Sequence, residues 1–183
     1  MSNDHDVIRQ TRAWLEQAVI GLNLCPFAKA VHVRGQVHFA VSAATDRRAV
    51  TQDLRNELAQ LVALPSRDRD TTLLILPDCL DDFLAFNDYL DEADRLVADM
   101  ALDGVIQIAS FHPQFQFAGT EEDDVTNCTN RSPYPMLHLL REESVARAVE
   151  AFPEADVIFE KNMQTLRELG SEGWAALGRE FMR

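Results

Sequence analysis

The spacing of apolar residues predicts that helices and strands alternate along the first two thirds of the chain. Apolar side chains at helical spacing indicate an amphipathic first helix over about residues 7–22. Alternating apolar residues predict a half-buried strand at Val37–Val41, and the continuous run Leu73–Leu76 predicts a strand buried on both faces. A helix opened by Asp46 lies between these strands, and a longer helix, Phe83–Met100, follows them.

A third strand, Val105–Ser110, follows Gly104 and completes the order strand, helix, strand, helix, strand. That order is typical of crossover units around a sheet whose faces are covered by helices. We therefore expect an α/β fold with a small, mostly parallel or mixed sheet of three to four strands, to which Phe115–Phe117 adds a short antiparallel strand. The alternative is an α+β ferredoxin-like arrangement.

The last third of the chain is predicted to be helical after a polar segment, Gly119–Asn130. One helix begins at Ser132 and runs to about Val149, and a helical C-terminal tail contains a helix that ends at Gly170. No repeat, low-complexity segment or linker interrupts the chain, so residues 1–183 are expected to form a single domain.

The charge balance narrows the class of partner. The chain has 17 basic and 30 acidic residues and a net charge of −13. Such a surface repels phosphate backbones and anionic lipids, so neither a nucleic acid nor a membrane is an expected partner. The first residues contain no apolar leader, and the three cysteines contain no CxxC pair. These features predict a cytoplasmic protein with reduced thiols.

Cys25 is the first candidate for chemistry. Pro26 suits the first position of a short helix over Pro26–Val31, which places Cys25 at the N-cap. The partial positive charge of a helix N-terminus favours thiolate over thiol and makes such a cysteine more nucleophilic. The alternative is a small apolar side chain that fills a gap in the core.

Two histidines are the next candidates. His112 directly follows the third strand, at the sheet edge where open α/β sheets bind ligands. His138 lies in an apolar run, and Glu142 four residues later shares its predicted helical face and is placed to orient the ring. The alternative for each is an imidazole that only satisfies one structural hydrogen bond.

The segment Asn130–Pro135 combines an arginine with the predicted start of a helix. Ser132 suits the N-cap and is followed by Pro133-Tyr134-Pro135, so its hydroxyl is less committed to capping than usual. Arg131 beside it can bind a carboxylate or phosphate with two hydrogen bonds. The alternative is a rigid capped turn in which Arg131 pairs with the acidic loop Glu121–Asp124.

Three segments of the sequence together resemble a known family. They are Gly21-Leu22-Asn23-Leu24-Cys25-Pro26-Phe27-Ala28, Ser110-Phe111-His112-Pro113 with Phe117-Ala118-Gly119, and Thr129-Asn130-Arg131-Ser132-Pro133-Tyr134-Pro135 with Leu137-His138-Leu139-Leu140-Arg141-Glu142. The chain is similar to the uncharacterised, mainly bacterial family catalogued as domain of unknown function 1415 over nearly its whole length. This resemblance implies no activity.

The leading hypothesis is one cleft that binds a small anionic molecule. Its residues are Cys25, His112, Asn130, Arg131, Ser132, Tyr134 and His138. As an enzyme, Cys25 is the nucleophile, His112 or His138 its base, and Arg131 the anion clamp.

Two other hypotheses remain open. In one, the protein is an enzyme in which His112 and His138, with a carboxylate or Cys25, ligate a divalent metal. In the other, the protein is a non-catalytic interaction module with an exposed apolar patch around Phe115 and Phe117. No dinucleotide, P-loop or zinc-protease motif is present, so the sequence identifies no cofactor.

Overall fold

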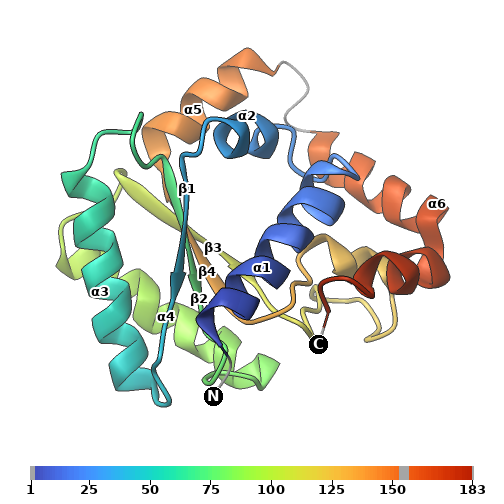
Figure 1. Cartoon of the computed structure of the whole chain (residues 1–183), viewed down its shortest axis with the longest axis horizontal. Coiled ribbons are helices and arrows are strands. Elements are labelled where there is room, and N and C mark those ends of the chain that lie inside the picture. Colours follow the sequence, from blue (N-terminus) through green and yellow to red (C-terminus); the bar gives the residue numbers. More distant parts are fainter. Residues whose placement is uncertain (1–2, 153–156, 183) are drawn as a thin grey trace.

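The computed structural model describes residues 3–152 and 157–182. A single mixed sheet of four strands stands at its centre, in the order β1-β2-β4-β3 (Figure 1). The strands are β1 (Val37–Val41), β2 (Thr71–Ile75), β3 (Ile106–Phe111) and β4 (Met136–Arg141). β1 and β2 are parallel, whereas β4 runs antiparallel to both of its neighbours, β2 and β3. Helices cover both faces, which confirms the expected α/β class and differs from the ferredoxin-like alternative.

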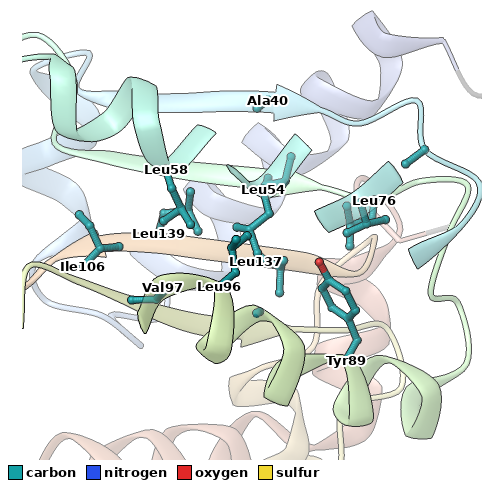
Figure 2. Packing of buried hydrophobic residues seen from close by; sticks show 14 of the residues in the cluster. Ala40, Leu54, Leu58, Leu76, Tyr89, Leu96, Val97, Ile106, Leu137 and Leu139 are labelled. Carbon is teal, nitrogen blue, oxygen red and sulfur yellow. The ribbon is translucent and has the colours of Figure 1, made fainter. Parts of the chain in front are cut away.

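Helices α3 (Arg47–Ala63) and α4 (Phe83–Asp99) cover one face of the sheet. Figure 2 shows how Leu54 and Leu58 of α3 and Leu96 of α4 point toward Leu137 and Leu139 of β4. Asp46 accepts a hydrogen bond of 2.9 Å from the N–H of Ala49 and so caps α3, as its position predicted. These contacts form the larger hydrophobic core.

The other face is covered by helices of more varied length and type. They are α1 (Asp4–Trp14), the π-helix η1 (Leu15–Ile20), α2 (Ala28–Val33), the 3₁₀-helix η2 (Val125–Thr129), α5 (Glu142–Ala151) and α6 (Ile158–Gly178). In Figure 1, α2 and α5 lie beside each other at one end of this face. Gly170 interrupts α6 with a positive φ of 69°, which fits the helix end predicted there.

The helix predicted to begin at Ser132 is wrong in its first half. Residues Met136–Arg141 form the central strand β4, and the helix starts only at Glu142. A strand buried on both faces is apolar at nearly every position, so its sequence imitates a buried helix. The antiparallel strand predicted at Phe115–Phe117 is also wrong, because β4 occupies the antiparallel position in the sheet.

The register of β4 decides where its one histidine points. Leu137 and Leu139 belong to the core under α3 and α4, so the alternating residues Met136, His138 and Leu140 face the opposite side. His138 is paired with Leu73 of β2 and with Ala109 of β3. The imidazole therefore stands at the middle of the sheet, on the face opposite α3 and α4.

Among the described residues, no helix combines the length and the apolar character that a membrane crossing requires.

Candidate functional site

A cavity of about 340 Å³ lies between the sheet and the helices on the side of His138. We call it the sheet cavity. Most of the side chains around it are apolar, and they come from all four strands, from α1, η1, α2 and α5, and from the turn before α2. The lining includes Trp14, Val19, Cys25, Phe27, Asp70, Thr71, Ala109, Phe111, His138, Arg141, Ser144, Val145 and Ala148. The size and apolar lining are those of a small-molecule site.

His138 is held from one side by Thr71. The Thr71 hydroxyl lies 2.6 Å from Nε2 of His138 and 2.7 Å from the carbonyl oxygen of Leu139. Thr71 has a single hydroxyl proton, and a carbonyl can only accept, so this proton goes to Leu139. The Thr71 oxygen must then accept from His138, which places the imidazole proton on Nε2.

Burial lowers the pKa of His138 to about 4. The ring is therefore neutral near pH 7, with its proton on Nε2 and a lone pair on Nδ1. The ring keeps some accessible surface because it lines the sheet cavity. His138 thus brings a hydrogen-bond acceptor to an otherwise apolar wall, and its predicted partner Glu142 belongs to α5 rather than to a shared helix.

Cys25 lines the same cavity from the helical side. The end of the π-helix fixes the turn that carries it, since the N–H groups of Leu24 and Cys25 both donate to the carbonyl of Val19, at 2.9 and 3.5 Å. Helix α2 begins at Ala28 with Phe27 as its N-cap, so the predicted N-cap position of Cys25 is wrong. The predicted boundary was two residues early, because the chain makes a turn at Pro26 before it becomes helical.

The electrostatic expectation for Cys25 is also corrected. Burial raises the pKa of its thiol, and the backbone N–H groups of Phe27 and Ala28 offset only part of this effect. The resting site therefore holds a neutral thiol and a neutral imidazole instead of an activated ion pair.

We expect Cys25 in the native protein to react with iodoacetamide at pH 7 several-fold more slowly than a cysteine in a short unfolded peptide. The reason is that the thiolate is the reacting species and burial disfavours it. Peptide mapping by mass spectrometry separates Cys25 from Cys79 and Cys128, and the protein in urea serves as the unprotected control. A native rate equal to or above that of the peptide would contradict this assignment of charge.

His112 does not line the sheet cavity. It directly follows β3, as expected, but its side chain is fully buried against Phe83 and Phe86 of α4, on the opposite face of the sheet. Its Nε2 lies 3.1 Å from the carbonyl of Leu80, and its Nδ1 accepts from the N–H of Gln114 at 3.0 Å. Both ring nitrogens are satisfied, so the imidazole joins the loop after β3 to the turn before α4.

The segment Asn130–Pro135 also lies outside the lining of the cavity. Asn130 donates to the carbonyl of Ser110 at 3.1 Å, and the buried Ser132 hydroxyl donates to the carbonyl of Tyr134 at 2.6 Å. The Tyr134 hydroxyl donates to the side chain of Gln10 in α1. Because β4 follows this segment, Ser132 caps no helix.

The Arg131 guanidinium donates to backbone carbonyls, and it would have to break these hydrogen bonds to bind an anion. It donates to the carbonyls of Phe115 at 3.2 Å and Glu122 at 2.6 Å. Its contact with the acidic loop is thus made to a backbone oxygen. The carbonyl of Arg131 accepts from the indole N–H of Trp14 at 2.9 Å. Through this bond the segment fixes Trp14, whose ring lines the cavity and contacts Phe111.

Sequence reasoning missed five polar residues that line the cavity, which are Asp70, Thr71, Gln107, Arg141 and Ser144. Thr71 orients His138, and Ser144 of α5 donates to Asp70 at 2.6 Å. Arg141 donates to the carbonyls of Leu64 at 2.7 Å and Arg69 at 3.0 Å, while its Nε is buried with no partner among the described residues. The available signal was a polar residue at the end of a buried apolar run, since Thr71 is the first residue of β2 and Arg141 the last residue of β4.

The described residues give little support to the metal-site hypothesis or to the interaction-module hypothesis. His112 and His138 lie on opposite faces of the sheet, and no cluster of three metal-ligating side chains occurs among the described residues. Phe115 and Phe117 are half-buried and pack against each other, with Phe117 also contacting Phe159. Of these rings, Phe159 is the most exposed.

Residues 6–176 match the family described as Protein of unknown function (DUF1415). The chain belongs to this family. The match confirms the resemblance seen in the three sequence segments. No curated protein and no solved structure matches the chain. The family segments include cavity residues: Cys25 lies in the first of them, Phe111 in the second, and His138 and Arg141 in the third.

Proposed function

We propose that this protein binds a small, largely apolar and uncharged organic molecule in the sheet cavity. The observation that carries the proposal is an apolar space of about 340 Å³ with one oriented imidazole in its wall. Aromatic side chains of Trp14, Phe27 and Phe111 provide flat contact surfaces for such a molecule. A few fixed polar groups in an apolar pocket are the usual composition of a ligand site.

The charges around the cavity favour a neutral ligand over the small anion expected from the sequence. An anion that enters an apolar space loses hydration and needs a cation or several donors in return. Arg131 lies elsewhere, and His138 is neutral with a lone pair toward any ligand. Arg141 is near, but it shares Nη2 among backbone carbonyls, and the carboxylate of Asp70 lies on the same wall.

Methoxynaphthalene, an uncharged aromatic ether, is a suitable probe because its binding needs only the apolar walls. We expect it to shift the indole N–H resonance of Trp14, which lines the cavity, and to leave that of Trp174 unchanged, since Trp174 packs against Phe181 away from it. Nuclear magnetic resonance of nitrogen-labelled protein reports both indoles in one sample, so Trp174 is the internal control.

The matched variant is Ala109→Leu, which extends a side chain into the cavity beside His138. We expect it to weaken the binding of methoxynaphthalene at least tenfold, about the effect of placing one side chain of this size in the ligand's space. Equal shifts of both indoles, or equal binding by Ala109→Leu, would count against the sheet cavity as the binding site.

A second candidate is an enzyme that uses Cys25 as nucleophile and His138 as base. It is favoured by one observation, which is that both residues line the same cavity. Their charge states weigh against it, because a proton must pass from a thiol of raised pKa to an imidazole whose pKa is about 4. The alkylation experiment on Cys25 distinguishes the two: a fast native reaction favours the enzyme, and a slow one favours the binding protein.

A further inference from the structure

We propose that the ligand of the sheet cavity carries a neutral hydrogen-bond donor, such as the hydroxyl of a phenol or another alcohol, and donates it to Nδ1 of His138. The proposal rests on the proposed function and names the chemical class of the ligand. Thr71 is its specificity-determining residue, acting through the imidazole rather than on the ligand.

Thr71 fixes the tautomer of His138. The Leu139 carbonyl is an acceptor only, and it takes the one proton of the Thr71 hydroxyl at 2.7 Å. Thr71 is buried and Leu139 is completely buried, so neither has ready access to water as a substitute partner. Reversing the hydrogen bond between Thr71 and His138 would take the hydroxyl proton away from the Leu139 carbonyl, so one of the two hydrogen bonds of Thr71 would be lost.

With the proton on Nε2, Nδ1 of His138 is left as a hydrogen-bond acceptor. Among the described residues no group donates to Nδ1, and Nδ1 is not among the fully buried polar atoms without a partner. It therefore has accessible surface, and the ring that carries it lines the cavity. A lone pair that faces an apolar space loses hydration when a ligand displaces water, unless the ligand supplies a proton.

Nδ1 of His138 discriminates among ligands of the same shape by the chemical group that each places against its lone pair. A hydroxyl supplies the proton that Nδ1 lacks, whereas an ether or a carboxylate places a second acceptor against the lone pair. An ammonium group would also donate, but most of the lining is apolar and penalises a buried charge. The aromatic side chains of Trp14, Phe27 and Phe111 favour a flat body on the same molecule.

The test compares naphthol, methoxynaphthalene and naphthoate, which share one ring system. We expect wild-type protein to bind naphthol about tenfold more tightly than methoxynaphthalene, and naphthoate most weakly, by calorimetric titration at pH 7. In His138→Leu, which removes the acceptor and keeps an apolar side chain, naphthol and methoxynaphthalene should bind equally. Persistence of the naphthol preference in this variant would overturn the proposal.

Thr71→Val provides a second variant of nearly the same shape. Valine cannot accept from Nε2, so the imidazole is free to move its proton to Nδ1, and the ratio of the affinity for naphthol to that for methoxynaphthalene should fall several-fold. An unchanged ratio would show that Thr71 does not set the preference of the site. If wild type binds naphthol and methoxynaphthalene equally, the donor class is wrong and the cavity site stands; if it binds neither, the proposed function itself fails.

Discussion

Acidification should destabilise the wild-type protein by about 2 to 3 kcal/mol more than it destabilises His138→Leu. In the folded protein burial lowers the pKa of His138 from its ordinary 6.5 to about 4. Between these two pH values the unfolded chain takes up a proton that the folded chain refuses, so the free energy of unfolding falls as the pH falls. The difference in pKa corresponds to at most about 3.4 kcal/mol, and the effect is complete only below pH 4.

Unfolding by guanidinium chloride at pH 7 and near pH 4.5 measures this effect. The many carboxylates and the buried His112 titrate in both proteins, so the difference between wild type and His138→Leu isolates His138. Well above pH 6.5 the histidine is neutral in both states, and the difference should no longer depend on pH. Equal losses of stability in the two proteins on acidification would show that His138 does titrate freely in the fold.

Gly21→Ala should cost about 3 kcal/mol or more of stability and disturb the turn that carries Cys25. A Cβ on Gly21 would lie 2.2 Å from the carbonyl oxygen of Gln17, and this contact is with backbone, which cannot rotate away. The close approach exists because Gly21 ends the π-helix η1, whose wider turns bring the two residues together. Relief requires a backbone shift, in the upper range of costs for overpacking.

Gly104→Ala is the matched control. Gly104 has a positive φ of 71°, and no atom lies within 4 Å of the position that a Cβ would take, so alanine there meets only the conformational cost of about 1 kcal/mol. Thermal and denaturant unfolding give the two costs, and iodoacetamide labelling of Cys25 reports on the turn. We expect faster labelling in Gly21→Ala alone. Equal costs for the two variants would mean that the backbone at Gly21 relaxes freely.

Local sequence patterns were sufficient to predict features that depend only on residues of the same helix. Asp46 caps α3, Gly170 breaks α6, and the apolar spacing of Phe83–Met100 gives α4 almost to its ends. Each of these features depends on hydrogen bonds and side-chain contacts between residues that are close together in the sequence, so the local residue types are enough to predict it.

Strand β4 shows where local patterns fail. Its residues suit a buried helix as well as a buried strand, and the choice depends on the unpaired edges of β2 and β3, which lie far away in the sequence. Once the segment is a strand, its period of two turns His138 away from Leu137 and Leu139 and toward the cavity. The helical interpretation gave His138 the wrong partner, Glu142 in place of Thr71.

Strand pairing also explains why the residues predicted to share one site lie in different places. Cys25 and His138 line one cavity because the register of β4 turns His138 toward the face that the turn carrying Cys25 covers, whereas His112 follows β3 onto the other face. Arg131, the most suggestive side chain in the sequence, is held by the carbonyls of Phe115 and Glu122. By itself, the sequence determined the α/β class, most helices and the family, because these follow from local spacing and recognisable segments. Only the tertiary structure decided which polar groups share a space and what charge they carry, because strand pairing and burial arise from residues distant in the chain.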